Sequence, residues 1–79
     1  MKQIVIAQRG WVFLGDVELV DDQVVITNAK NIRRWGTTRG LGQLAIDGPQ
    51  TDTEVDDYGT VRVHKLAVVA TIDVTSTKW

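Results

Sequence analysis

The sequence predicts an all-β fold, either a small barrel or a compact sandwich of about six or seven short strands. Short runs of β-branched residues alternate with polar residues, turn residues separate the runs, and no segment has the apolar spacing of an amphipathic helix. The chain has 79 residues, of which 43% are hydrophobic, an ordinary share for a globular protein. We therefore expect a single small β domain over residues 1–79, without linkers or internal repeats.

The first half of the chain predicts three consecutive strands. Residues 4–6 form a short apolar strand, and residues 11–19 form a longer one. Gly15 lies inside the longer strand, where a glycine commonly marks a bend or bulge. A tight turn at residues 21–22 then leads into a return strand, residues 24–35.

The second half begins with a flexible, glycine-rich loop at residues 36–42, followed by a short apolar strand at residues 44–46. Thr51, Thr53 and Val55 alternate with acidic residues, which is typical of a strand with one solvent-facing side. We expect a turn at residues 57–59 and two further strands, residues 60–64 and 67–74.

Charge is distributed in two neighbouring blocks, although the net charge is only −1. Residues 23–46 contain no acidic residue and four of the nine lysines and arginines, whereas residues 47–57 contain five acidic residues and no basic one. The blocks either pair with each other, within or between subunits, or leave the basic block free to bind an anion. The residues alone leave both alternatives open. The overall charge argues against tight nonspecific DNA binding.

The stretch I-R-R-W-G-T-T-R-G-L-G, residues 32–42, has the composition of a ligand site. Guanidinium groups bind phosphate, an aromatic face stacks on a base, and hydroxyls with backbone N–H groups complete a cradle for an anion. In the structural alternative, Trp35 belongs to the core, the glycines permit positive φ angles, and one of two adjacent arginines pairs with the acidic block. The candidate ligand-binding residues are Arg33, Arg34, Trp35, Thr37, Thr38, Arg39 and Gly40.

Residues for catalysis or metal binding are scarce. The chain has no cysteine and a single histidine, His64, and no Walker, H-x-x-x-H or dinucleotide-binding pattern occurs. A lone histidine in a strand is usually a surface or packing residue. The carboxylates of Asp52, Glu54 and Asp56 would lie about 7 Å apart along a strand and would not converge on a cation. We therefore expect no enzymatic activity, no metal and no cofactor.

Residues 32–49, I-R-R-W-G-T-T-R-G-L-G-Q-L-A-I-D-G-P, resemble a family of small, functionally uncharacterised proteins encoded by tailed phages and prophages. The elements R-G-W at residues 9–11, G-T-V-R-V at 59–63 and A-V-V-A-T-I-D at 67–73 extend the resemblance along most of the chain. The resemblance implies a phage origin but no particular activity. Because no long apolar run or secretion signal is present, we expect the cytoplasm of an infected or lysogenic host cell and no membrane partner.

A weaker, architectural similarity is to Sm-like small barrels. Residues 12–32 resemble their bent hairpin, and residues 60–74 resemble their last two strands, with residues 64–66 as the turn between them. The chain lacks the N-terminal helix and the loop motifs of Sm-like RNA binders. The similarity implies assembly into a ring through strand edges, because an open small barrel exposes unpaired edges.

The size of the chain also predicts self-association, since a domain this small buries only about 60% of its unfolded surface and has no disulfide to stabilise it. We therefore expect a homo-oligomer with one of two functions. It binds an anionic nucleotide-like ligand or a nucleic acid through residues 33–42, or it is a structural or assembly component of a phage particle with the same loop as a subunit contact.

Overall fold

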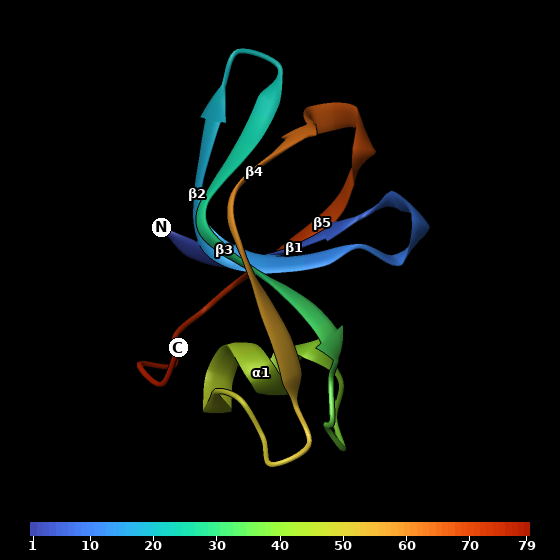
Figure 1. Ribbon diagram of the computed structural model, residues 1–79, viewed down its shortest axis with the longest axis vertical. Coiled ribbons are helices and arrows are strands. Elements are labelled where there is room, and N and C mark those ends of the chain that lie inside the picture. Colours follow the sequence, from blue (N-terminus) through green and yellow to red (C-terminus); the bar gives the residue numbers. More distant parts are fainter.

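Five strands, one α-helix and two short 3-10 turns make up the computed structural model, which describes all 79 residues (Figure 1). The strands form one antiparallel sheet in the order β4-β3-β2-β1-β5. The first and last strands are therefore neighbours, and β4 and β5 form the two outer edges. The elements are β1 Lys2–Ala7, β2 Val12–Val20, β3 Gln23–Arg34, α1 Leu41–Asp47, β4 Glu54–His64 and β5 Val68–Asp73, with 3-10 turns at Gln8–Gly10 and Lys65–Ala67.

The β class predicted from the sequence is confirmed, but the sheet is open and does not close into a barrel. The sheet has five strands, whereas the sequence predicted about six or seven. One reason is that β4 is continuous through residues 57–59, where we expected a turn. Gly59 has a φ of +75°, and the register with β3 leaves Tyr58 without a partner, so this segment is a bulge. Bulges and turns use the same residue types, which explains the error.

The helix α1 lies in a region where the sequence predicted a loop and a short strand, residues 36–46. Its buried residues, Leu41, Leu44 and Ala45, follow the helical spacing i, i+3, i+4 and pack against one face of the sheet. Glycines flank the helix on both sides, with φ of +80° and +88°. A helix of seven residues contains only about two turns, so the periodic spacing of its apolar residues was not recognisable in the glycine-rich sequence around it.

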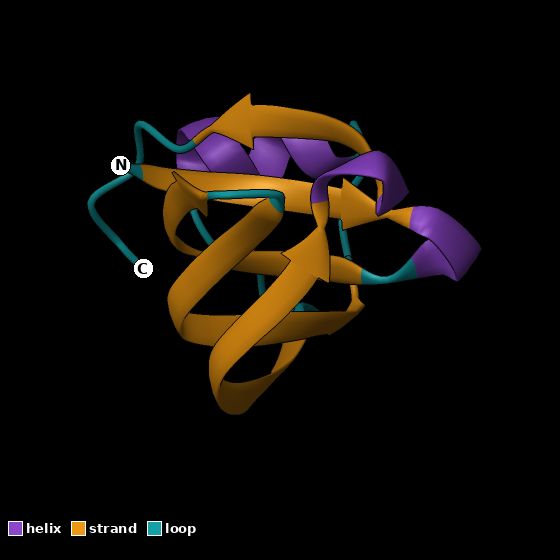
Figure 2. Cartoon of the chain, turned by 90° about the horizontal axis from the view of Figure 1, so that it is seen from above, coloured by secondary structure: helices purple, strands orange, loops and turns teal.

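The sheet has a hydrophobic core on each face. The first core lies between α1 and the sheet, and its residues are Ile4, Val12, Leu14, Ile32, Leu41, Leu44 and Ala45. The second core consists of Val5, Phe13, Val24, Ile26 and Ala29, with Val17, Val61, Val63 and Val68 packed against it. Residues of both edge strands contact this second cluster, so the sheet itself curls around it (Figure 2).

The strand β2 bends at Gly15, as the sequence predicted. Its register with β3 shifts between Leu14 and Asp16, and Asn28 on β3 has a φ of +52°. Gly15 is required there, because a Cβ atom would lie 2.7 Å from Ile26 Cγ2 and 2.8 Å from the carbonyl oxygen of Thr27. The expected tight turn at residues 21–22 also joins β2 to β3. The bulge opens the sheet next to the pocket described below.

Candidate functional site

The predicted ligand loop connects the end of β3 to the start of α1. Arg33, near the end of β3, donates from Nε to Asp56 Oδ2 on the neighbouring strand β4 at 3.0 Å, and its Nη1 lies 3.7 Å from Glu54 Oε2. The hydrogen bond that Arg33 donates to Asp56, together with the negative charges of Asp56 and Glu54, raises the pKa of Arg33 above its ordinary value. Arg33 is therefore the arginine that pairs with the acidic block, a role expected for one of the two adjacent arginines.

Three consecutive backbone donors of the loop, the N–H groups of Thr38, Arg39 and Gly40, already have acceptors. The N–H groups of Thr38 and Arg39 both donate to Gln43 Oε1, at 3.0 and 2.9 Å, and the N–H of Gly40 donates to Thr37 Oγ1 at 3.1 Å. The carbonyl oxygen of the Gln43 side chain thus occupies the place where a cradle of N–H groups would hold an anion. A ligand would have to displace the side chain of Gln43.

Ion pairs within the chain join the two charge blocks. Lys30 Nζ lies 2.8 Å from Asp57 Oδ1 on β4, and Arg39 Nη2 lies 2.6 Å from Asp47 Oδ2 at the end of α1. Together with the Arg33 contacts, these pairs show intramolecular pairing of the blocks. All the side chains involved are substantially exposed, so the pairs orient the loop more than they stabilise the fold.

Arg34 and Trp35 remain open to solvent. Arg34 is exposed and forms no ion pair, and Trp35 is 43% exposed. The backbone of this segment is held tightly. The Trp35 carbonyl accepts a 2.7 Å hydrogen bond from Thr53 Oγ1, and Gly36, with a φ of +63°, packs so closely against the backbone of Asp52 that a side chain would not fit. Of the candidate residues, these two alone present a free cation and a free aromatic face.

His64 has a local structural contact. Its Nδ1 accepts a hydrogen bond from the N–H of Leu66 at 3.1 Å and so caps the 3-10 turn Lys65–Ala67 between β4 and β5. No group of three or more histidine, aspartate or glutamate side chains gathers in the geometry of a metal site.

Sequence reasoning missed an aromatic pocket of about 290 Å³ at the second core. The rings of Trp11 and Phe13 are stacked, with centroids 5.7 Å apart and an interplanar angle of 7°, and Tyr58 lies 6.0 Å from Phe13. Trp11 and Tyr58 are each 47% exposed. Alternation along the predicted strand of residues 11–19 does place Trp11 and Phe13 on one face, but Tyr58 comes from the bulge that we predicted as a turn.

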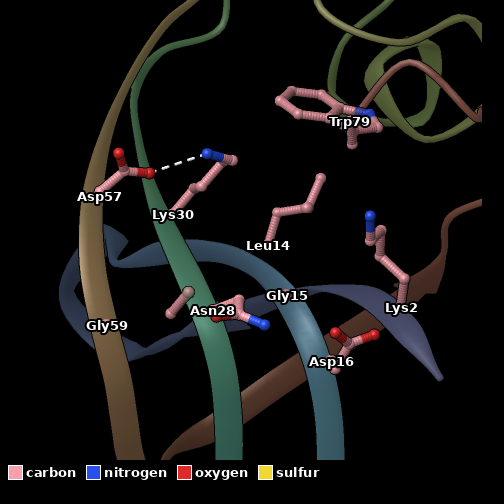
Figure 3. Close-up of a pocket in the computed structure, with 10 residues that line it drawn as sticks. Lys2, Leu14, Gly15, Asp16, Asn28, Lys30, Asp57, Gly59 and Trp79 are labelled. Atoms are coloured by element: carbon pink, nitrogen blue, oxygen red, sulfur yellow. Dashed lines mark hydrogen bonds and ion pairs between the residues drawn. The ribbon is translucent and has the colours of Figure 1, made fainter.

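A second pocket, of about 380 Å³, lies over the β2–β3 bulge and has a polar lining (Figure 3). Four strands contribute to it, together with Trp79, which lies beside Leu14 in the same view. Its charged members are Lys2 and Asp16 on one side and the ion-paired Lys30 and Asp57 on the other. No short motif encodes this pocket, because its residues come from positions 2 to 79.

None of the helices is long and apolar enough to span a bilayer. Comparison of the chain with protein-family models and with curated proteins found no match in either case.

Proposed function

We propose that the protein is a non-enzymatic, self-assembling protein whose copies associate through the edge strand β5. This role corresponds to a structural or assembly component, one of the two functions expected from the sequence. It places the subunit contact at β5 rather than at the loop of residues 33–42, because Arg33, Arg39 and the N–H groups of Thr38 and Arg39 make contacts within their own chain.

The observation that carries this proposal is the lack of protection on β5. This strand pairs with β1 on one side only, and its sequence V-V-A-T-I-D carries no charge before Asp73 and no proline or glycine. Val69 on this strand is 67% exposed, and Leu66, just before it, is 75% exposed. Natural proteins block free strand edges with charges, proline or bulges, so an uncharged valine-rich edge indicates a strand partner.

The opposite edge of the sheet favours β5 of a second copy as that partner. The other edge strand, β4, carries Glu54, Asp56, Asp57 and Arg62 and contains a bulge, features that oppose pairing with another strand. Two β5 strands related by a two-fold axis run antiparallel and continue the sheet from one copy into the next. The proposal therefore predicts a symmetric dimer with Val69 in its interface.

Light scattering of the purified protein over a range of concentrations tests this assembly. We expect twice the 8.8 kDa mass of one chain, and we expect Val69→Lys to shift the protein toward monomer, because a charge on the edge opposes strand pairing. Leu19→Lys is the matched control, since Leu19 is 63% exposed but lies at the tip of the β2–β3 hairpin. A monomer at all concentrations, or an equal effect of both substitutions, contradicts the proposal.

A second candidate function, binding of an anionic nucleotide-like ligand or nucleic acid, is supported by the exposed pair Arg34 and Trp35. In this narrower form, Arg34 contacts phosphate and Trp35 stacks on a base, while Arg33 and Arg39 stay in their ion pairs. A thermal-shift screen of a nucleotide panel tests this function, and a shift in the wild type that Arg34→Ala abolishes would support it.

A further inference from the structure

We propose that the polar pocket over the β2–β3 bulge binds a free α-amino acid with an apolar side chain, in its zwitterionic form. The pocket lies within one chain, so this inference is independent of the assembly proposed above. The supporting observation is that a cation, a carboxylate and an amide without partners in the protein line one pocket, next to an apolar ring (Figure 3).

The bulge shapes the floor of the pocket. Gly15, a buried residue without a side chain, lines the pocket, and the register shift between Leu14 and Asp16 separates β2 locally from its regular pairing with β3. Asn28 stands beside this gap with a φ of +52°. The resulting volume of about 380 Å³ falls within the range of pockets that hold small molecules.

Lys2 and Asp16 supply one group of each charge without a partner in the protein. They are cross-strand neighbours in the β1–β2 register, yet they form no ion pair with each other or with any other residue. The side-chain amide of Asn28 also lacks a hydrogen-bond partner within the chain. Figure 3 shows the Lys2 ammonium, the Asp16 carboxylate and the Asn28 amide around the same space.

These groups match the two ends of an α-amino acid. Lys2 Nζ and the Asn28 amide can donate to an α-carboxylate, and the Asp16 carboxylate can accept from an α-ammonium group. Across the pocket, Lys30 and Asp57 neutralise each other at 2.8 Å, so the lining as a whole carries no net charge. A zwitterion preserves this balance, whereas a nucleotide would bring several uncompensated negative charges into the pocket.

The apolar wall selects for an apolar side chain. The ring of Trp79, which is partly buried and lies next to the fully buried side chain of Leu14, supplies this wall at one end of the pocket. The ring is held in position because Trp79 Nε1 donates to the carbonyl oxygen of Leu44 at 2.8 Å. A branched aliphatic side chain would therefore meet a surface that is already in place, which lowers the entropic cost of binding.

Three probes with the same isobutyl group test the charge pattern: L-leucine, L-leucinamide, which lacks the carboxylate, and 4-methylpentanoate, which lacks the ammonium group. Titrations followed by ¹H–¹⁵N NMR should show that L-leucine shifts the backbone amides of Gly15, Asn28 and Gly59, which line the pocket. Each analogue should bind about tenfold more weakly or worse, because each leaves one charged group of the pocket unpaired.

Substitutions of the two charged residues assign the contacts. Lys2→Met should weaken L-leucine binding about tenfold but leave the weak binding of L-leucinamide unchanged, and Asp16→Asn should leave that of 4-methylpentanoate unchanged. Lys78→Met and Asp21→Asn are the matched controls, since both residues are exposed and lie outside the pocket. The controls should bind L-leucine like the wild type.

The probe series on the wild-type protein keeps the proposal testable even if a variant is poorly folded. Equal binding of all three probes would show that the charges take no part and would overturn the proposal. The absence of amide shifts at about 10 mM L-leucine would also overturn it, as would shifts confined to residues outside the pocket.

Discussion

Gly15→Ala tests the close packing at the β2–β3 bulge. The added Cβ would lie 2.7 Å from Ile26 Cγ2, 2.8 Å from the Thr27 carbonyl oxygen and 3.2 Å from Ala29 Cα. Two of these neighbours are backbone atoms, and the third belongs to a side chain that is 0% exposed, so none can move without disturbing the second core. Overpacking of this kind costs about 1–3 kcal/mol, and the backbone contacts place this substitution at about 2–3 kcal/mol.

For a domain of this size, each kcal/mol corresponds to about 4–8 °C in Tm, so we expect Gly15→Ala to lower Tm by about 8–24 °C. Thermal and urea unfolding followed by circular dichroism measure the loss. Gly42→Ala is the matched control, because no atom lies within 4 Å of its added Cβ and Gly42 is inside α1. It should stabilise the protein by about 0.5–1 kcal/mol. If Gly15→Ala unfolds at the wild-type temperature, the close approach of β2 and β3 described here is wrong.

Three further outcomes are expected. Gln43→Leu should increase hydrogen exchange at the two loop amides that donate to its side chain by about fivefold, because a hydrogen bond contributes about 1 kcal/mol; unchanged exchange would show that Gln43 does not hold the loop. Trp79→Phe should cost at least about 1 kcal/mol of unfolding free energy in urea, since the bond to the Leu44 carbonyl is lost and the smaller phenyl ring packs less well against the first core, and a wild-type midpoint would count against that bond. In the nucleotide thermal-shift screen, Arg34→Ala should remove any ligand-induced shift whereas Arg39→Ala should not, because Arg39 is paired within the chain. The reverse result would favour a site in which Arg39 contacts the phosphate.

Local signals in the sequence predicted the fold best where a single residue determines the backbone. The bend at Gly15 and the turn at residues 21–22 follow directly from glycine and paired aspartates between β-branched runs. The same signals misled at residues 57–59, because the residues of a bulge are also turn residues. The helix α1 was missed because only its contact with the sheet, through Leu44 and its neighbours, distinguishes it from a short strand.

The residue composition predicted where the candidate loop lies, but not which contacts its residues make. The arginines, threonines and glycines of residues 33–40 do form one loop, as expected. The sequence could not show that Gln43, in the first turn of α1, accepts the hydrogen bonds from two of their N–H groups. Nor could it show the polar pocket, whose side chains come together only when four strands are in register.

The pairing of β1 with β5 determines the order in which the sheet can be completed. Gln3 and Asp73, which share a 2.8 Å hydrogen bond, are 70 residues apart in the chain. During synthesis, the β1 edge that will pair with β5 therefore has no partner until the last strand has left the ribosome. Contacts of such long sequence separation also slow folding. A newly made chain thus exposes the apolar strand β1 for longer than any other part of the sheet, and this strand is where we expect chaperones to bind and aggregation to begin.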